Sequence, residues 1–214
     1  MPIEGGGGGD PSPMTAFGVH QAISTLADDV LSVDQLTGIR VAVQGLGKVG
    51  LALAQQLQAA GAIVIGTDIQ PDRIRAAHAL LGIRTVAPDA IFDVPCEIFA
   101  PCGLGGVRNE RTIARLNCKI VAGCANNQLA TDQDGEALHA RGIVYGVDYV
   151  INAGGLINTA DELHGYNEAR ARAKTAEIAQ TVKHMLATAR TQGISTHQAA
   201  RQITIEILRA ARQG

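Results

Sequence analysis

The chain has 214 residues, 46% of them hydrophobic, and 18 Lys and Arg against 20 Asp and Glu give a formal net charge of −2. This length suits one large domain with appendages. The mixed charges give no support for a nucleic-acid or anionic-membrane partner. No apolar run reaches the roughly 18 residues of a membrane span, and no basic region precedes an apolar stretch at the N-terminus. We therefore expect a cytoplasmic protein with a substantial core.

The four cysteines are Cys96, Cys102, Cys118 and Cys124, and they form no C-x-x-C pair. No histidine stands at the spacing of a zinc finger, so we predict reduced, mostly buried thiols and no metal site. Cys102 and Cys124 fall beside expected ligand loops. Their oxidation could disturb binding as a side effect.

The first elements in chain order are a lead-in and a helix. Residues 1–13 are rich in glycine and proline, which predicts an irregular hinge segment, with one domain over 14–214. Thr15 is a candidate N-cap for a helix that runs to about Leu31. After a polar link, the β-rich run 39–43 predicts a strand.

A glycine motif follows this strand. Gly45-Leu46-Gly47-Lys48-Val49-Gly50 has the G-x-G-x-x-G spacing, and a helix-forming run, 51–60, continues it. In this motif the first glycine permits a tight turn, the second lets the backbone approach a pyrophosphate, and the third lets helix and strand pack closely. The strand 62–67 then ends at Asp68, 23 residues after Gly45, which is near the spacing of a carboxylate that binds ribose hydroxyls.

Strands and helices continue to alternate along the chain. Strands are expected at 84–86, 96–100, 119–122 and 143–145, and helices at 72–81, 110–116, 134–141, 167–191 and 196–212. This alternation predicts an α/β fold, a doubly wound, Rossmann-like parallel sheet with right-handed crossovers and C-terminal helices.

Polar and glycine-rich clusters fall at five expected strand ends. In a doubly wound sheet, ligands bind outside the carboxyl ends of the strands. The sequence therefore predicts one ligand cleft built by these clusters. They are Gly45 to Gly50, Asp68, Pro101 to Gly106, Asn126 with Asn127, and Asn152 to Gly155.

Several segments together resemble the leucine/phenylalanine/valine/tryptophan dehydrogenase group of the glutamate dehydrogenase superfamily. The resemblance covers nearly the whole chain from about Gly8, and the segments DYVINAGG and ANNQL carry it more specifically than the glycine motif. The matching segments are 9–13 with Thr15 and Ala16, 45–50, 100–102, 125–129, 148–155, 160–163 and 165–167.

The resemblance implies NAD-dependent oxidative deamination of an L-amino acid to a 2-oxo acid and ammonia. It implies that cofactor-binding residues line the cleft, and that substrate-binding residues follow them. The implied cofactor residues are Thr15, Gly45, Leu46, Gly47, Lys48, Val49, Asp68, Ile69, Cys102, Gly103, Asn126 and Asn152. The implied substrate residues are Asn127, with Asn126 as its alternative, and Leu156 and Thr159.

Alternatives stay open at several of these positions. Thr15 could be a helix cap and no more, the asparagine pair 126–127 could cap a turn, and Leu156 could be plain core. Arg73 and Arg75 could bind an NADP 2′-phosphate, but the Asp68 carboxylate would repel that group, which favours NAD.

The resembled family carries two catalytic lysines and an aspartate on a separate N-terminal domain. The four lysines here (48, 119, 174 and 183) match none of those positions, and the glycines 5–9 match the hinge. We therefore expect this chain alone to bind NAD(H) without turnover. The alternatives are a non-catalytic NAD(H)-binding module and the cofactor half of a split enzyme that needs a separate catalytic chain.

The sequence also bears on the class of substrate and on a partner. No basic residue lies between Leu156 and Asp161, so a branched-chain or aromatic amino acid is favoured over glutamate. The resemblance places an apolar face of the C-terminal helix toward the other domain, which predicts a partner or a homo-oligomer.

Overall fold

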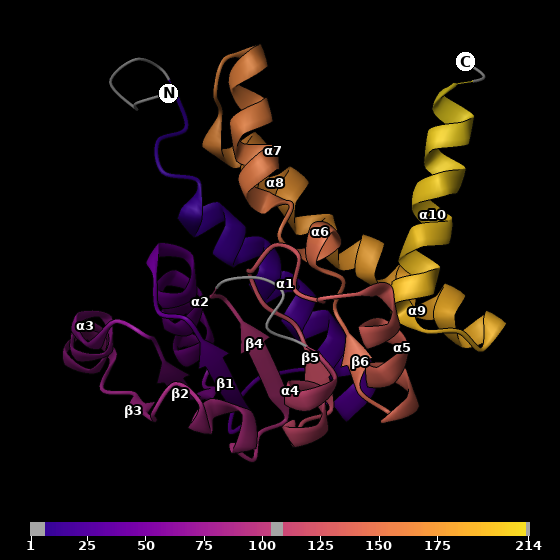
Figure 1. The fold of residues 1–214 in the computed structure, drawn as a ribbon. Coiled ribbons are helices and arrows are strands. Elements are labelled where there is room, and N and C mark those ends of the chain that lie inside the picture. The colour runs from indigo at the N-terminus through magenta and orange to yellow at the C-terminus, as the bar shows by residue number, and fades with distance from the viewer. Residues whose placement is uncertain (1–6, 104–108, 213–214) are drawn as a thin grey trace.

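The structure is a computed structural model that describes residues 7–103 and 109–212. Its centre is a six-stranded, all-parallel sheet in the order β3-β2-β1-β4-β5-β6 (Figure 1). The order reverses between β1 and β4, which confirms the predicted doubly wound sheet. The strands are β1 Arg40–Gln44, β2 Ile63–Thr67, β3 Arg84–Thr85, β4 Ile98–Pro101, β5 Ile120–Val121 and β6 Val144–Tyr145.

Apolar residues of the central strands form the core. In β1, residues 41–43 are fully buried, and Val41 is in register with Val64 of β2 and Ile98 of β4. A run that is apolar at successive positions is typical of a parallel strand covered on both faces. Right-handed crossovers place α2 and α3 on one face of the sheet and α4 and α5 on the other.

The helices continue beyond the sheet to the C-terminus. They are α1 Ser12–Leu31, α2 Lys48–Ala59, α3 Pro71–Leu81, α4 Glu110–Arg115, α5 Asp132–Ala140, α6 Asp148–Ile151, α7 Gly154–Asp161, α8 Glu168–Ala176, α9 Ile178–Gln192 and α10 Thr196–Ala211. Two 3-10 turns, Ala90–Asp93 and Glu162–His164, complete the described elements.

Helix α1 joins the two ends of the chain. It packs on α2 and also on α7, α8 and α9, so the C-terminal helices fold back onto the N-terminal one. A Cβ added at Gly18 would lie 2.8 Å from Ile178 Cδ1, which shows how closely α1 approaches α9. The guanidinium of Arg172 stacks 3.8 Å from the Phe17 ring centroid.

Two sequence predictions about helices are wrong. Thr15 is not an N-cap, because the helix begins at Ser12 with proline in its first turn, and Thr15 Oγ1 donates to the Pro11 carbonyl (3.0 Å). The single helix expected over 167–191 is two helices that meet at Glu177, where the Glu177 N–H donates to the Lys174 carbonyl (3.2 Å). This bond to the third preceding residue tightens the turn and ends α8.

Helices α7 and α10 project from the domain as two arms (Figure 1). The base of α10 is fixed by Thr196 Oγ1, which donates to the Tyr145 carbonyl (2.7 Å), and by Ser195 Oγ, which donates to Glu136 (2.6 Å). Large apolar side chains stay exposed farther along this arm, at Ile205, Ile207 and Leu208. In the part of the chain described, no helix combines the length and apolarity that crossing a membrane requires.

Candidate cofactor and substrate cleft

The glycine turn joins β1 to α2 at the switch point of the sheet. Gly45 has a φ of +100°, and a Cβ there would lie 2.5 Å from the Gly103 nitrogen. A Cβ at Gly50 would collide with the Gly45 carbonyl oxygen. Gly47 differs, because its φ is −71° and the atom nearest to an added Cβ is Arg73 Nη1, 3.6 Å away. The fold therefore requires Gly45 and Gly50, whereas Gly47 leaves bare backbone facing the cleft.

Asp68 is held firmly beside this turn. Its buried carboxylate accepts the Leu46 N–H on Oδ2 (2.8 Å) and the Gln70 N–H on Oδ1 (2.9 Å). Arg73 Nη1 lies 3.5 Å from Oδ2. The Leu46 N–H is thus turned to Asp68, and the Leu46 side chain is buried in the core.

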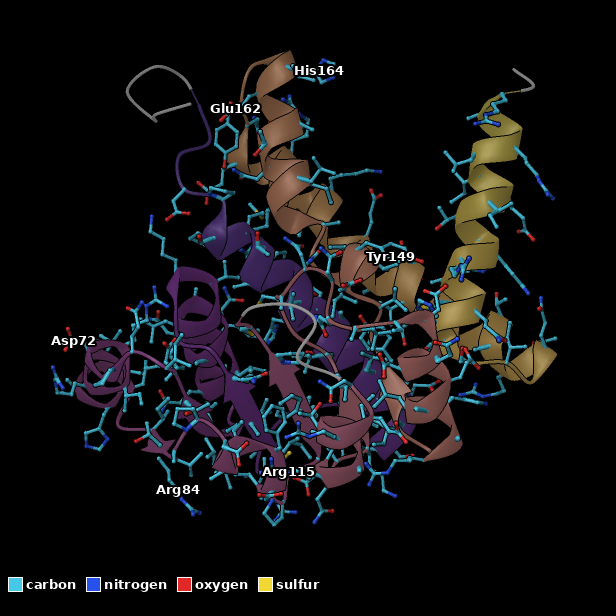
Figure 2. All side chains as sticks on the ribbon, in the orientation of Figure 1. Asp72, Arg84, Arg115, Tyr149, Glu162 and His164 are labelled. Carbon is cyan, nitrogen blue, oxygen red and sulfur yellow. The ribbon has the colours of Figure 1, made fainter. Side chains whose placement is uncertain are left out.

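Arg75 points away from the cleft. It pairs with Asp72, which lies on the outer side of α3 (Figure 2). Of the two arginines considered for a 2′-phosphate, the structure brings Arg73 alone to the cleft.

Two cavities open along the carboxyl ends of the strands. The first has a volume of about 470 Å³ and lies between the glycine turn, the end of β2 and the end of β4. The second, of about 670 Å³, lies between α2, the end of β5 and α6–α7. The predicted residues that line the first are Gly45, Gly47, Asp68, Ile69, Cys102 and Gly103. Those that line the second are Thr15, Val49, Asn126, Asn127, Asn152 and Leu156.

Hydrogen bonds hold the asparagine loop of the second cavity, residues 126–127, in place. Buried Gln128 donates through Nε2 to the carbonyls of Gly123 (2.8 Å) and Ala125 (3.0 Å). Asn126 Oδ1 accepts a hydrogen bond from Asn152 Nδ2 (2.6 Å). Asn127 is exposed and has a left-handed φ of 48°, so its side chain is presented by a strained, supported turn.

The remaining predicted residues divide between the cavity and its surroundings. Leu156 is 74% exposed on α7, which rules out a core role. Thr159 lines neither cavity, and its Oγ1 donates to the Gly155 carbonyl (3.1 Å). Lys48 is exposed and forms an ion pair with Asp10 at 3.4 Å.

Sequence reasoning assigned no site role to two residues of the second cavity, Asp148 and Tyr149, and it placed Cys124, which also lines this cavity, only beside a ligand loop. Asp148 accepts the N–H groups of Gln128 (2.9 Å) and Tyr149 (2.8 Å), so it anchors the asparagine loop to α6. Burial raises the pKa of Tyr149, whose ring lies between α6 and α10 (Figure 2). Asp148 and Tyr149 stand in the segment DYVINAGG, which supported the family resemblance but in which Asn152 alone was assigned a binding role.

The charged groups of the cleft are few. Among the described residues that line the two cavities, Arg73 is the one cationic side chain, and none is a lysine. No group of three or more His, Cys, Asp and Glu within the described ranges could hold a metal ion.

Comparison with known proteins finds matches along almost the whole chain. The profile of the Glutamate/Leucine/Phenylalanine/Valine dehydrogenase family matches residues 5–70 and 72–213. Leucine dehydrogenase of Bacillus cereus is 43% identical over 201 residues, which are 94% of this chain and 55% of that protein. Phenylalanine dehydrogenase of Caldalkalibacillus thermarum is 42% identical over 213 residues, 97% of this chain and 58% of that protein.

A solved structure gives the same result. The crystal structure of L-tryptophan dehydrogenase from Nostoc punctiforme matches with a TM-score of 0.92 and 37% identity, over 96% of this chain and 63% of that one. The chain thus spans about half the length of the curated relatives it matches. From its fold, its cleft and these matches, the chain belongs to the glutamate/leucine/phenylalanine/valine dehydrogenase family.

Proposed function

We propose that this chain is the NAD(H)-binding part of an L-amino acid dehydrogenase that deaminates a branched-chain or aromatic substrate. The observation that carries the proposal is Gly47, which has no Cβ although the surrounding protein would accept one. Bare backbone at the start of a helix, between two cavities, suits a pyrophosphate that spans them. The first N–H groups and the positive end of α2 would stabilise its charge.

The two cavities suit the two halves of the cofactor. The first would hold the adenosine half, with Asp68 and Ile69 at the ribose and Cys102 and Gly103 on the opposite wall. The second would hold the nicotinamide half beside Thr15, Asn126 and Asn152. When bound, NAD⁺ supplies the hydride acceptor. Asp68 favours NAD over NADP because its fixed negative charge would repel a 2′-phosphate.

The substrate would lie on the open side of the second cavity. Asn127 is exposed there and would accept or donate a hydrogen bond near the reacting amino group. Leu156 would form an apolar wall, with Thr159 one turn farther along α7. The described lining residues of this cavity include no Lys, Arg or His that would pair with a second carboxylate, and leucine, phenylalanine and tryptophan dehydrogenases are among the relatives.

The acid–base groups would come from outside these residues. A general base must reach the reacting proton within hydrogen-bond distance. Near the nicotinamide position, Asp148 is engaged by two backbone N–H groups, and burial raises the pKa of the Tyr149 phenol. We therefore expect cofactor binding without turnover. A non-catalytic module has less support, because an NAD(H) sensor needs no exposed Asn127 and Leu156; a split enzyme predicts rescue by a second chain.

Two measurements on the purified chain test the proposal. NADH titration, followed by nucleotide fluorescence, should give saturable binding. NADH production from NAD⁺ with a panel of branched-chain and aromatic L-amino acids at alkaline pH should be absent. A chain that does not bind NADH contradicts the cofactor assignment, and turnover contradicts the expectation that the acid–base groups lie elsewhere.

A further inference from the structure

Two cysteines meet at the floor of the cleft. Paired residues of β4 and β5 differ by 22 positions, as Ile98–Ile120 and Phe99–Val121 do, and the same offset relates Cys102 to Cys124. Beyond the strands, the Cys124 N–H donates to Cys102 Sγ (3.5 Å), and the two thiols are hydrogen-bonded to each other. This direct contact places the two cysteines side by side just beyond the ends of β4 and β5.

The two thiols differ in their access to solvent. Cys102 is half-buried and lines the first cavity, whereas Cys124 is 8% exposed and lines the second. Burial, and then the hydrogen bond to Cys102, raises the pKa of the Cys124 thiol. The backbone N–H directed at Cys102 Sγ stabilises negative charge on that sulfur. Cys102 is therefore the sulfur that an oxidant would reach first.

We propose that Cys102 and Cys124 form a reversible oxidation site that a peroxide closes to a disulfide, and that closure blocks the NAD(H) site of the proposed function. In the first step, Cys102 Sγ attacks one peroxide oxygen and the O–O bond breaks; the other oxygen leaves as water, and Cys102 becomes a sulfenic acid. In the second step, Cys124 Sγ attacks the Cys102 sulfur, the S–O bond breaks, and the hydroxyl leaves with the Cys124 proton as water. Two thiols are oxidised, and one hydrogen peroxide is reduced to two waters.

The glycine turn would transmit this closure to the nucleotide. Cys102 Cβ lies 3.0 Å from the position of a Cβ on Gly50, and the carbonyl carbon of Cys102 lies 2.8 Å from that of a Cβ on Gly45. Because Cys102 packs so closely on the glycine turn, a shift of Cys102 toward Cys124 would displace either this turn or the residues that line the two cavities. We expect the Kd for NADH to rise at least about tenfold.

The same two strands carry an internal control. Cys96 and Cys118 share the offset of 22 at the opposite ends of β4 and β5, away from the cleft. Burial raises the pKa of Cys96 to about 11 and that of Cys118 to about 12, so thiolate is scarce at both. A Cys118→Ser variant therefore should still form the Cys102–Cys124 disulfide, whereas Cys124→Ser should form no disulfide.

The test treats the reduced chain with hydrogen peroxide and measures intact mass, non-reduced tryptic peptides and NADH affinity, before and after dithiothreitol. Trypsin places Cys124 in peptide 120–141 and Cys118 in peptide 116–119, and fragmentation separates Cys96 from Cys102 within peptide 85–108. Wild type and Cys118→Ser should lose two hydrogens, link Cys102 to Cys124, and lose affinity until they are reduced. Cys124→Ser should give a sulfenic acid that dimedone traps, and each variant is compared with its own reduced form.

Other outcomes overturn the proposal. These are a Cys96–Cys118 link, the absence of any link, or a Cys102–Cys124 link that leaves NADH affinity unchanged. Failure of the reduced wild type to bind NADH contradicts the proposed function and the blocking step, while the peptide map still decides whether the disulfide forms.

Discussion

Replacing Gly47 by alanine separates a binding role from a folding role at the glycine turn. The backbone there, with φ −71° and ψ −169°, is open to alanine, and no protein atom lies within 3.6 Å of the new Cβ. Alanine is a poorer N-cap than glycine, but it restricts the unfolded chain, and each effect is worth roughly 0.5–1 kcal/mol. We expect the free energy of unfolding to change by less than about 1 kcal/mol.

Nucleotide affinity should respond much more strongly. The methyl group would occupy the space that the pyrophosphate needs, and would lengthen hydrogen bonds to a charged group worth about 1.5–3 kcal/mol. That loss corresponds to an increase in Kd for NADH of about tenfold to a hundredfold. Urea unfolding without nucleotide and NADH titration give the two quantities separately.

Gly50→Ala is the matched comparison. Its Cβ would collide with the Gly45 carbonyl, so it should destabilise the fold by about 1–3 kcal/mol as well as weaken binding. An unchanged NADH affinity in Gly47→Ala would refute the placement of the pyrophosphate. Equal destabilisation by the two substitutions would refute the claim that Gly47 has no packing role.

Three more results are expected. Asp68→Asn should reduce the preference for NADH over NADPH about tenfold, because the repelling charge is removed while Arg73 stays nearby; paired titrations check it, and an unchanged preference would assign selectivity elsewhere. Hydrogen bonds from Arg115 lower the pKa of Asp89 and Asp93 from 3.8, so their stabilisation is present above pH 3.8 and lost as pH falls through the lowered folded-state values. Urea unfolding should therefore show a stability difference between wild type and Arg115→Met that shrinks below pH 3.8. A constant difference would assign it to the packing of Arg115 on the Phe92 ring, whose centroid lies 5.4 Å from Arg115 Cζ. Ile207→Lys, on the exposed face of α10, should reduce self-association as measured by light scattering. A wild type that stays monomeric would contradict the prediction that this face mediates self-association.

Local signals made most of the fold predictable. The β-rich runs of β1 and β2 and the glycine after α3 mark their element boundaries within the sequence itself. The break at Glu177 carries no glycine or proline, so nothing in the sequence marked it. The helix α6 was missed because its four residues are too short to show a period.

The residues of the cleft were predictable where a sequence motif stands at the end of a strand. They were less predictable where their contacts depend on how two strands pair. Gly123 illustrates the difference, because a Cβ there would collide with Pro101 of the neighbouring strand. A glycine is required at this position because the chain after β5 packs on the end of β4. No local sequence pattern indicates that contact. The contact between Cys102 and Cys124 depends on the same pairing, whereas the position of Thr159 depends on how α7 is rotated.

The packing of α1 on α9 also determines when α1 can be completely buried during synthesis. Residues 12–31 leave the ribosome before residues 178–192, yet part of the surface that buries them belongs to this later segment. Until that segment emerges, the face of α1 around Gly18 lacks its contact with Ile178, although Ile151 and Thr175 already lie beside it. Nascent chains truncated before α9 should therefore keep faster-exchanging amides in α1 than chains that include α9.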